Sequence, residues 1–96
     1  MPEEIQKVQK LIFKDFEIED SGIAYSSIEK LKIWLASEIR NMMDRDFQKL
    51  LNMLYRIDVD EQKTRLAFMD EDPAVRLTEL IIERELRKVK TREKYK

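Results

Sequence analysis

The chain has 96 residues and is 43% hydrophobic, which suits one small domain with a single core. It contains neither cysteine nor histidine, which excludes disulfides, thiolate ligands and an imidazole acting as general base or metal ligand. The formal net charge is −1, but residues 84–96 carry seven bases and two acids, so a basic tail follows an acidic body.

The composition favours helices. One glycine and two prolines are too few for the turns of an all-β fold, whereas the abundant Leu, Glu, Lys, Arg and Met are good helix formers. No segment approaches the roughly 18 apolar residues of a membrane span, and the first residues lack the pattern of a signal peptide. We therefore predict a cytoplasmic, all-α protein with one domain over residues 1–96, folded as a compact bundle of four or five helices.

The first predicted helix covers residues 1–16. Its apolar stripe repeats at steps of three and four and consists of Ile5, Val8, Ile12 and Phe16. Phe13 falls outside the stripe, so we expect an exposed aromatic side chain or, alternatively, a second contact surface. Beyond this helix, Asp20-Ser21-Gly22 predicts a turn, and a short extended piece at residues 16–19 is an alternative.

The second predicted helix covers residues 26–43. Ser26-x-x-Glu29 matches a capping box, in which each side chain satisfies a backbone amide of the other residue. The apolar stripe that follows consists of Ile28, Leu31, Leu35, Ile39 and Met42. Trp34 lies beside this stripe and is predicted to be a wedge at the edge of the core, with a binding anchor as the alternative.

The densest apolar run covers residues 47–61, and we expect the chain to be organised around it, with the flanking segments folded against it. Its stripe consists of Phe47, Leu50, Leu54 and Ile57, widened by Leu51 and Met53. This stripe is offset from the preceding one by roughly a quarter turn, and Asp44 or Asp46 could cap a new helix. The pattern favours two helices with a tight junction over one long curved helix.

A short helix is predicted next, over residues 60–69. Asp58-x-x-Glu61 resembles a cap for it. Its predicted buried side chains are Leu66, Ala67 and Phe68. The cluster of acids at its start and the cluster at residues 70–72 both lack the glycine and the final glutamate of a calcium-binding EF-hand loop. We therefore predict helix caps there and no metal site.

The last predicted helix runs from Pro73 to about Arg92, after a cap at Asp72, and its basic end is expected to fray from about residue 84. Its first half is apolar over much of its circumference, which indicates either a central buried helix or a surface for a partner. The candidate partner contacts are Val75, Ile82, Leu86 and Val89. Surface ion pairs are predicted for Glu83 with Arg87 and for Glu85 with Lys88.

The basic tail suggests a second hypothesis, contact with nucleic acid. Lysine and arginine clusters bind phosphate backbones, and the candidate contacts are Arg87, Lys88, Lys90, Arg92 and Lys94. The segment has no helix-turn-helix, RNA-recognition or zinc-finger pattern, so a solvated helix end is the alternative interpretation.

No catalytic, cofactor-binding or metal-binding residue is predicted. A single glycine cannot build a phosphate-binding loop or a nucleophile elbow, so we expect no enzyme activity, no cofactor and no small-molecule ligand. LLNMLYRIDVDEQK (residues 50–63) and LTELIIERELRKVKTRE (residues 77–93) resemble a small, uncharacterised all-helical family of bacterial proteins. The resemblance covers about the C-terminal half and implies no activity and no site residues.

The sequence as a whole therefore predicts a non-enzymatic module for protein–protein interaction that can self-associate, with no membrane contact. A nucleic-acid-contacting accessory protein that uses the basic C-terminal helix is the alternative.

Overall fold

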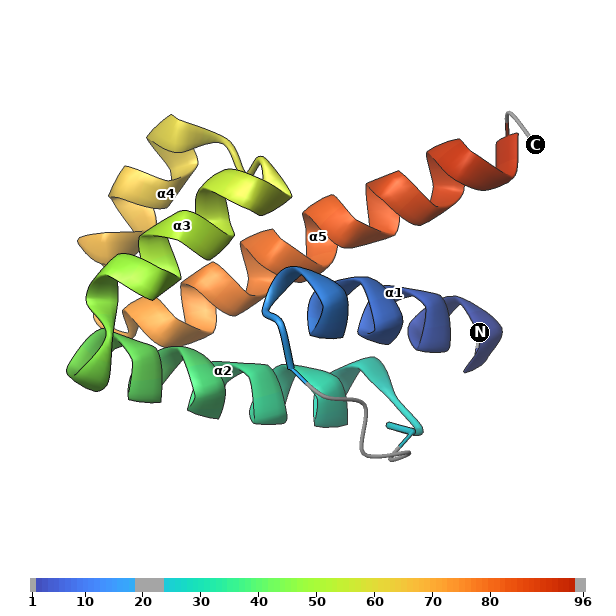
Figure 1. The fold of residues 1–96 in the computed structure, drawn as a ribbon, viewed down its shortest axis with the longest axis horizontal. Helices are drawn as coiled ribbons and strands as arrows, with labels where there is room; N and C mark the ends of the chain where they lie inside the picture. The colour runs from blue at the N-terminus through green and yellow to red at the C-terminus, as the bar shows by residue number, and fades with distance from the viewer. Residues whose placement is uncertain (1, 19–23, 95–96) are drawn as a thin grey trace.

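The computed structural model describes residues 2–18 and 24–94, and within these ranges the chain folds into α-helices joined by short connections (Figure 1). The helices are α1 (Pro2–Asp15), α2 (Ile28–Arg45), α3 (Phe47–Ile57), α4 (Glu61–Phe68) and α5 (Pro73–Lys94). The radius of gyration is 13.0 Å, and a compact domain of this length is expected to have about 12–13 Å. The predicted all-α bundle is thus confirmed.

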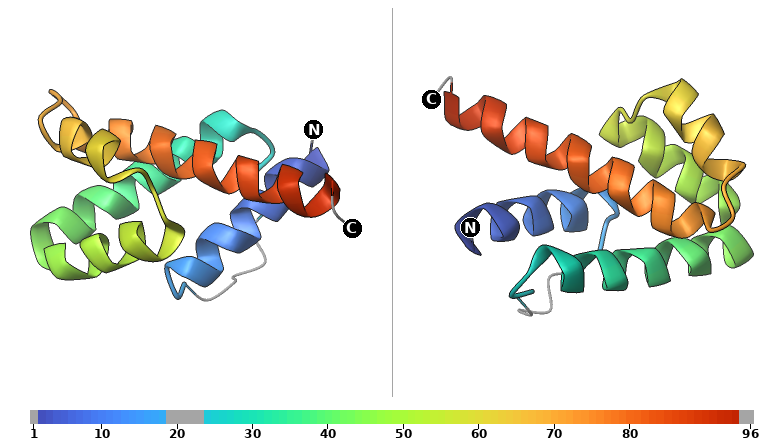
Figure 2. Two further views of the ribbon diagram at one scale, coloured as in Figure 1. Left: turned by 90° about the horizontal axis from the view of Figure 1, so that it is seen from above. Right: turned by 180° about the vertical axis from the view of Figure 1, so that it is seen from behind.

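Helix α5 lies at the centre of the bundle, and within the described residues it packs against each of the other helices (Figures 1 and 2). The bundle is therefore organised around α5 and not around residues 47–61, although α1, α2 and α5 all pack against α3. Helix α3 is apolar on one side only and buries that side, whereas the first half of α5 is apolar in several directions. A helix of the second kind can be covered from several sides at once, and this places α5 in the middle.

The apolar side of α3 is buried, as predicted. Leu50, Met53, Leu54 and Ile57 are buried in the common core. Phe47 and Leu51 were expected to belong to the same stripe, but both lie on the exposed part of the helix. The reason is geometric, because residues 47 and 51 sit at the edge of the stripe, where α4 covers them only in part: the Phe47 ring contacts Phe68 of α4 with 5.5 Å between centroids.

The stripe of α1 is buried as predicted, but Phe13 differs from the expectation of an exposed aromatic side chain. Phe13 is only 7% exposed, because its ring packs against Trp34 of α2 with 5.1 Å between ring centroids. Trp34 also contacts Tyr25, with 5.8 Å between centroids, and is partly buried at the edge of the core, as predicted. The predicted turn at residues 20–22 lies outside the described residues.

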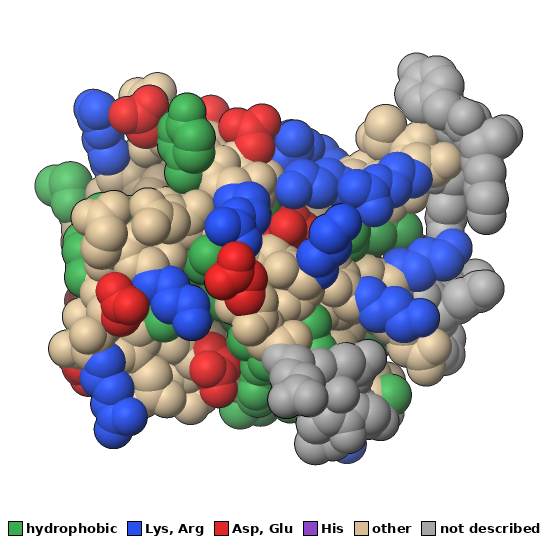
Figure 3. Space-filling model, in the orientation of Figure 1, with side chains coloured by type: hydrophobic (Ala, Val, Ile, Leu, Met, Phe, Trp, Pro, Cys, Tyr) green, Lys and Arg blue, Asp and Glu red, His purple; other side chains and the backbone are tan. Residues whose placement is uncertain are grey.

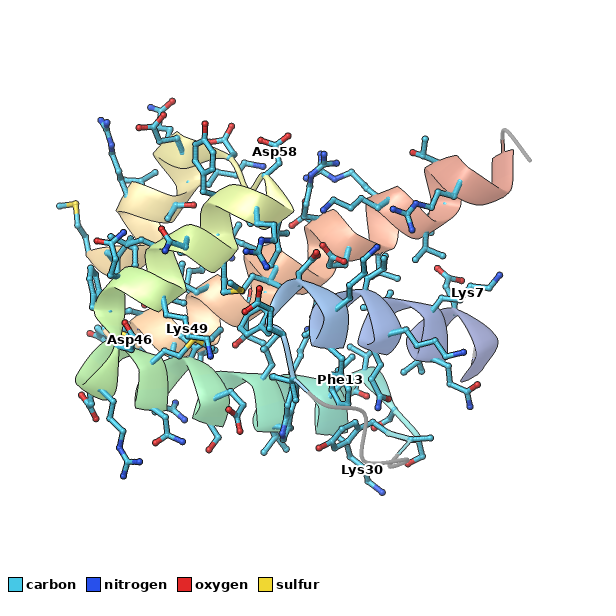
Figure 4. The ribbon with its side chains drawn as sticks, in the orientation of Figure 1. Lys7, Phe13, Lys30, Asp46, Lys49 and Asp58 are labelled. Atoms are coloured by element: carbon cyan, nitrogen blue, oxygen red, sulfur yellow. The ribbon has the colours of Figure 1, made fainter. Side chains whose placement is uncertain are left out.

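Three aspartate and serine caps fix the helix starts, two of them one or two residues away from the predicted position. Ser27, not Ser26, caps α2 and accepts from the Lys30 amide. Asp46 ends α2 and also caps α3, where its Oδ1 accepts from the Lys49 amide (Figure 4). The predicted tight junction between two helices is confirmed. Asp60, not Asp58, caps α4.

Asp58 is displaced from the capping role because it ends α3. It adopts the left-handed conformation at φ 66°, and the Val59 amide then bonds back to the Leu54 carbonyl. Glu17 does the same after α1, at φ 54°, with the Ile18 amide bonding to the Phe13 carbonyl. Both ends are Schellman motifs built without glycine, and the motif after α1 replaces the short extended piece considered from the sequence.

An arginine from another helix holds each of these two ends. Arg56 of α3 donates to the Asp15 carbonyl and to the Glu17 carboxylate, at 3.2 Å each. Arg84 of α5 donates through Nε to the Asp58 carbonyl at 3.1 Å. Carbonyls at a helix end have no partner inside their own helix, so these arginines satisfy them while they join the helices. In the described part of the chain, none of these helices has the length and apolar character to traverse a lipid bilayer.

Candidate interaction surface

The four candidate partner contacts on α5 differ in accessibility. Ile82 and Val89 are buried in the core of the chain itself, and Leu86 is partly buried against it. Only Val75 is exposed, at 40%. Of the two alternatives, a central buried helix and a surface for a partner, the apolar first half of α5 therefore corresponds mainly to the central buried helix. Ile82 and Val89 have no surface to offer a partner in this fold.

Helix α2 and the first half of α5 pack against each other (Figure 2). Val75 lies at a groove between these two helices. The cavity volume is about 240 Å³, and the lining residues are Lys32, Ile33, Ala36, Arg40, Val75, Thr78 and Glu79. Ile33 is 72% exposed. Ile33 is not a member of the apolar stripe predicted for residues 26–43, and no signal in the sequence indicated that it stands next to a hollow.

Some of the side chains that line this groove are short and buried. Ala36 and Thr78 are both buried. The Thr78 hydroxyl donates to the Ala74 carbonyl at 2.7 Å, so it is satisfied within its own helix. Between the taller Ile33 and Val75, these short side chains leave room that a side chain from another molecule can fill.

The rims of the groove carry charges of both signs. Lys32 and Arg40 belong to α2, and Glu79 belongs to α5. Arg40 of α2 pairs with Asp72, the residue before α5, at 2.8 Å. Glu79 pairs with Arg76 along α5 at 3.1 Å. Lys32 makes no ion pair within the described residues, so its charge is available to a partner.

A second hollow lies between α3 and α4. It has a cavity volume of about 400 Å³, and its lining residues are Leu51, Leu54, Tyr55, Asp58, Val59, Asp60, Glu61 and Thr64. Tyr55 stands at its edge and is 90% exposed. Half of the lining is polar, and two of the three acids already pair with Arg84 and Arg65. A smaller share of its exposed surface is apolar than in the groove between α2 and α5.

The candidate nucleic-acid contacts lie on the C-terminal half of α5. Arg87 pairs with Glu83 at 3.6 Å and Lys88 with Glu85 at 3.1 Å, so both predicted ion pairs are confirmed. Lys90 and Arg92 are exposed. The side chain of Lys94 lies outside the described residues.

Glu85 is a feature that sequence reasoning missed, because it was assigned to a surface ion pair. Its side chain has no exposed surface, and its Oε2 has no hydrogen-bond partner among the described residues. Burial raises the pKa of Glu85; the Lys88 ammonium opposes this rise and the Asp15 carboxylate adds to it. The available signal was position, since Glu85 continues the stripe of Thr78, Ile81 and Ile82 at helical spacing.

Within residues 2–18 and 24–94, no group of three or more Asp and Glu side chains is arranged to hold a metal ion. The acids at the predicted caps instead accept from backbone amides or pair with arginines. Comparison with protein-family models, with curated proteins and with solved structures finds no match for this chain.

Proposed function

We propose that this protein is a non-enzymatic interaction module that self-associates through the groove between α2 and α5. The observation that carries this proposal is Ile33, a 72% exposed aliphatic side chain beside a hollow of about 240 Å³. A protrusion and a hollow on one patch suit an isologous dimer, in which each copy offers both to the other. The lack of cysteine agrees with action in the reducing cytoplasm.

A two-fold axis parallel to the groove would place α2 of each copy over α5 of the other. Ile33 of one copy would then pack on Val75 and the small side chains of the second copy. Lys32 would face Glu79 of the second copy, which carries the opposite charge. When the patch is rotated by 180°, each rim of the groove therefore faces a rim of opposite charge on the second copy. This complementarity favours a second copy of the chain as the occupant of the groove.

Sedimentation equilibrium over a concentration series tests the proposal. We expect the mass of the wild-type protein to rise from one chain toward two. Ile33→Lys and Val75→Lys should each weaken the dimer about ten-fold or more. Each variant loses about 1.5–3 kcal/mol of stabilisation from the buried apolar side chain and places a charge in the interface instead. Circular dichroism verifies that each variant is folded.

Leu66→Lys is the matched control, because Leu66 is 62% exposed on α4 and does not line the groove. It should leave the dimer unchanged. A wild-type protein that stays at the mass of one chain at millimolar concentration would contradict the proposal, as would an equal effect of Leu66→Lys.

A further inference from the structure

The last residue of α1 brings a second carboxylate to the buried Glu85 of α5. Asp15 ends α1, and its carboxylate lies within reach of a hydrogen bond to the carboxylate of Glu85. Glu85 has no exposed side-chain surface, and its Oε2 has no hydrogen-bond donor among the described residues. Two carboxylates thus face each other where α1 and α5 pack together.

The cations around this pair of carboxylates do not neutralise it. Lys88 lies 3.1 Å from Oε1 of Glu85 and compensates one of the two charges. Arg56 of α3 donates to the carbonyl of Asp15 and to the carboxylate of Glu17, and not to the Asp15 carboxylate. In the part of the chain that the structure describes, α2 and α4 place no charged side chain against Glu85. Other lysine and arginine side chains over the second half of α5 stand at the surface (Figure 3), where water and salt screen their charge.

The backbone adds to the excess of negative charge. Asp15 stands at the C-terminal end of α1, where the carbonyl groups of a helix carry a partial negative charge. A carboxylate at this end is unfavourable, and a second carboxylate beside it increases the repulsion. One proton held between the two carboxyl groups removes this repulsion, and it also supplies the donor that Oε2 of Glu85 lacks.

We propose that one proton shared by Glu85 and Asp15 holds the end of α1 against α5, and that loss of this proton weakens the attachment of α1. The protonated carboxyl group donates to the other carboxylate across the two helices, and such charge-assisted hydrogen bonds are strong. Once the proton has left, two negative charges face each other in a site that Lys88 compensates only in part. The closed state binds the proton more tightly than the open state, so α1 is held most firmly in acid and less firmly as pH rises.

The fold contains a natural reporter for the opening of α1. Trp34 of α2 is the only tryptophan of the chain, and its ring packs on Phe13 of α1 with 5.1 Å between centroids. Opening of α1 therefore removes the Phe13 ring and admits water to Trp34. Burial and the Glu38 carboxylate raise the pKa of Tyr25, the other ring beside Trp34, so this phenol stays neutral below about pH 8.5 and leaves the signal undisturbed.

Amide hydrogen exchange followed by NMR from about pH 5.5 to about pH 8.5, together with Trp34 fluorescence, tests the proposal. We expect the protection factors of α1 amides to fall about 5–30-fold relative to those of α3 as pH rises, with a parallel shift of the Trp34 emission to longer wavelength. Glu85→Gln and Asp15→Asn each replace one carboxylate by an amide that donates a hydrogen bond at any pH, so each should abolish the fall. In Asp15→Asn the carboxyl signal of Glu85 should also titrate at lower pH, because a group that raises the pKa of Glu85 is gone.

Asp44→Asn is the matched control, because it makes the same chemical change at an exposed position of α2. It should keep the fall seen in the wild-type protein. The proposal is overturned by α1 protection that does not change with pH, by an equal fall in α1 and α3, or by a fall that persists in Glu85→Gln or Asp15→Asn. Should Glu85→Gln fail to fold, the comparison of the wild-type protein with Asp15→Asn decides by the same criteria.

Discussion

The Lys88 ammonium lies 3.1 Å from Oε1 of Glu85, a carboxylate without exposed surface. The other oxygen, Oε2, has no hydrogen-bond donor among the described residues. The lysine thus compensates only part of the cost of burying this charge. An unsatisfied buried group of this kind costs about 1–3 kcal/mol, and this makes Glu85 a destabilising position when it is ionised.

Stability should therefore fall as pH rises through the titration of Glu85. Burial raises the pKa of Glu85 above its value in the unfolded chain, so the folded state holds the proton more tightly. The contribution of Glu85 to the free energy of unfolding is fully present below the pKa of Glu85 in the unfolded chain. It is lost as pH rises through the raised pKa of Glu85 in the folded protein. Glu85→Gln should increase the free energy of unfolding by about 1–2 kcal/mol at pH 8 and little at pH 4.

Urea denaturation of both proteins from pH 4 to pH 8 measures this difference. Carboxylates that do not interact with Glu85 titrate equally in the two proteins, so their contributions cancel. Glu83→Gln on the exposed side of α5 should change stability by less than about 0.5 kcal/mol. Parallel curves for wild type and Glu85→Gln would show that Glu85 is not responsible.

Arg84 should matter more than an ordinary surface arginine. It donates to the Asp58 carbonyl at 3.1 Å and also lies 3.5 Å from the Asp58 carboxylate, so it joins α5 to the end of α3. We expect Arg84→Ala to lower the free energy of unfolding by about 1–2 kcal/mol, because that carbonyl loses a charged donor. Arg65→Ala is the control: its pair with Glu61 is highly exposed and should contribute at most about 0.5 kcal/mol. Equal losses in thermal unfolding would refute a special role for Arg84.

The junction between α2 and α3 depends on one carboxylate. Asp46 Oδ1 accepts from the Lys49 amide at 3.1 Å, and Asp46 also ends α2. Asp46→Ala should cost about 1 kcal/mol, the usual effect of losing an N-cap. Asp44→Ala, inside α2, should cost almost nothing. Chemical denaturation measures both, and a larger loss for Asp44→Ala would be incompatible with the assigned cap.

The periodic apolar stripes made the helices predictable, whereas the exact caps were not. An apolar stripe can be recognised from the residues of one segment alone. The helices over Ile5 to Phe16 and over Leu50 to Ile57 were therefore predictable from the spacing of their apolar residues. The sequence alone does not decide whether Asp58 or Asp60 caps α4, because the side chain of either residue can accept a hydrogen bond from a backbone amide. Asp58 is used in the left-handed end of α3, and only then does Asp60 begin α4.

The candidate surface was predictable only in part. Val75 and Ile82 both belong to the apolar first half of α5, yet Val75 is exposed and Ile82 is buried. Which side of α5 is covered depends on where α1 and α2 pack, and their position is set by contacts between distant segments. The exposed Ile33 beside a hollow is likewise a property of packing and leaves no mark in local spacing.

The most direct test of self-association through the α2–α5 groove is a charge exchange followed by sedimentation velocity. Lys32→Glu and Glu79→Lys each place like charges opposite one another across the proposed two-fold axis, and the double variant restores opposite charges. We predict that each single variant shifts the protein toward one chain and that the double variant recovers the dimer. A wild-type protein that never dimerises, or a double variant weaker than both single ones, would contradict the account.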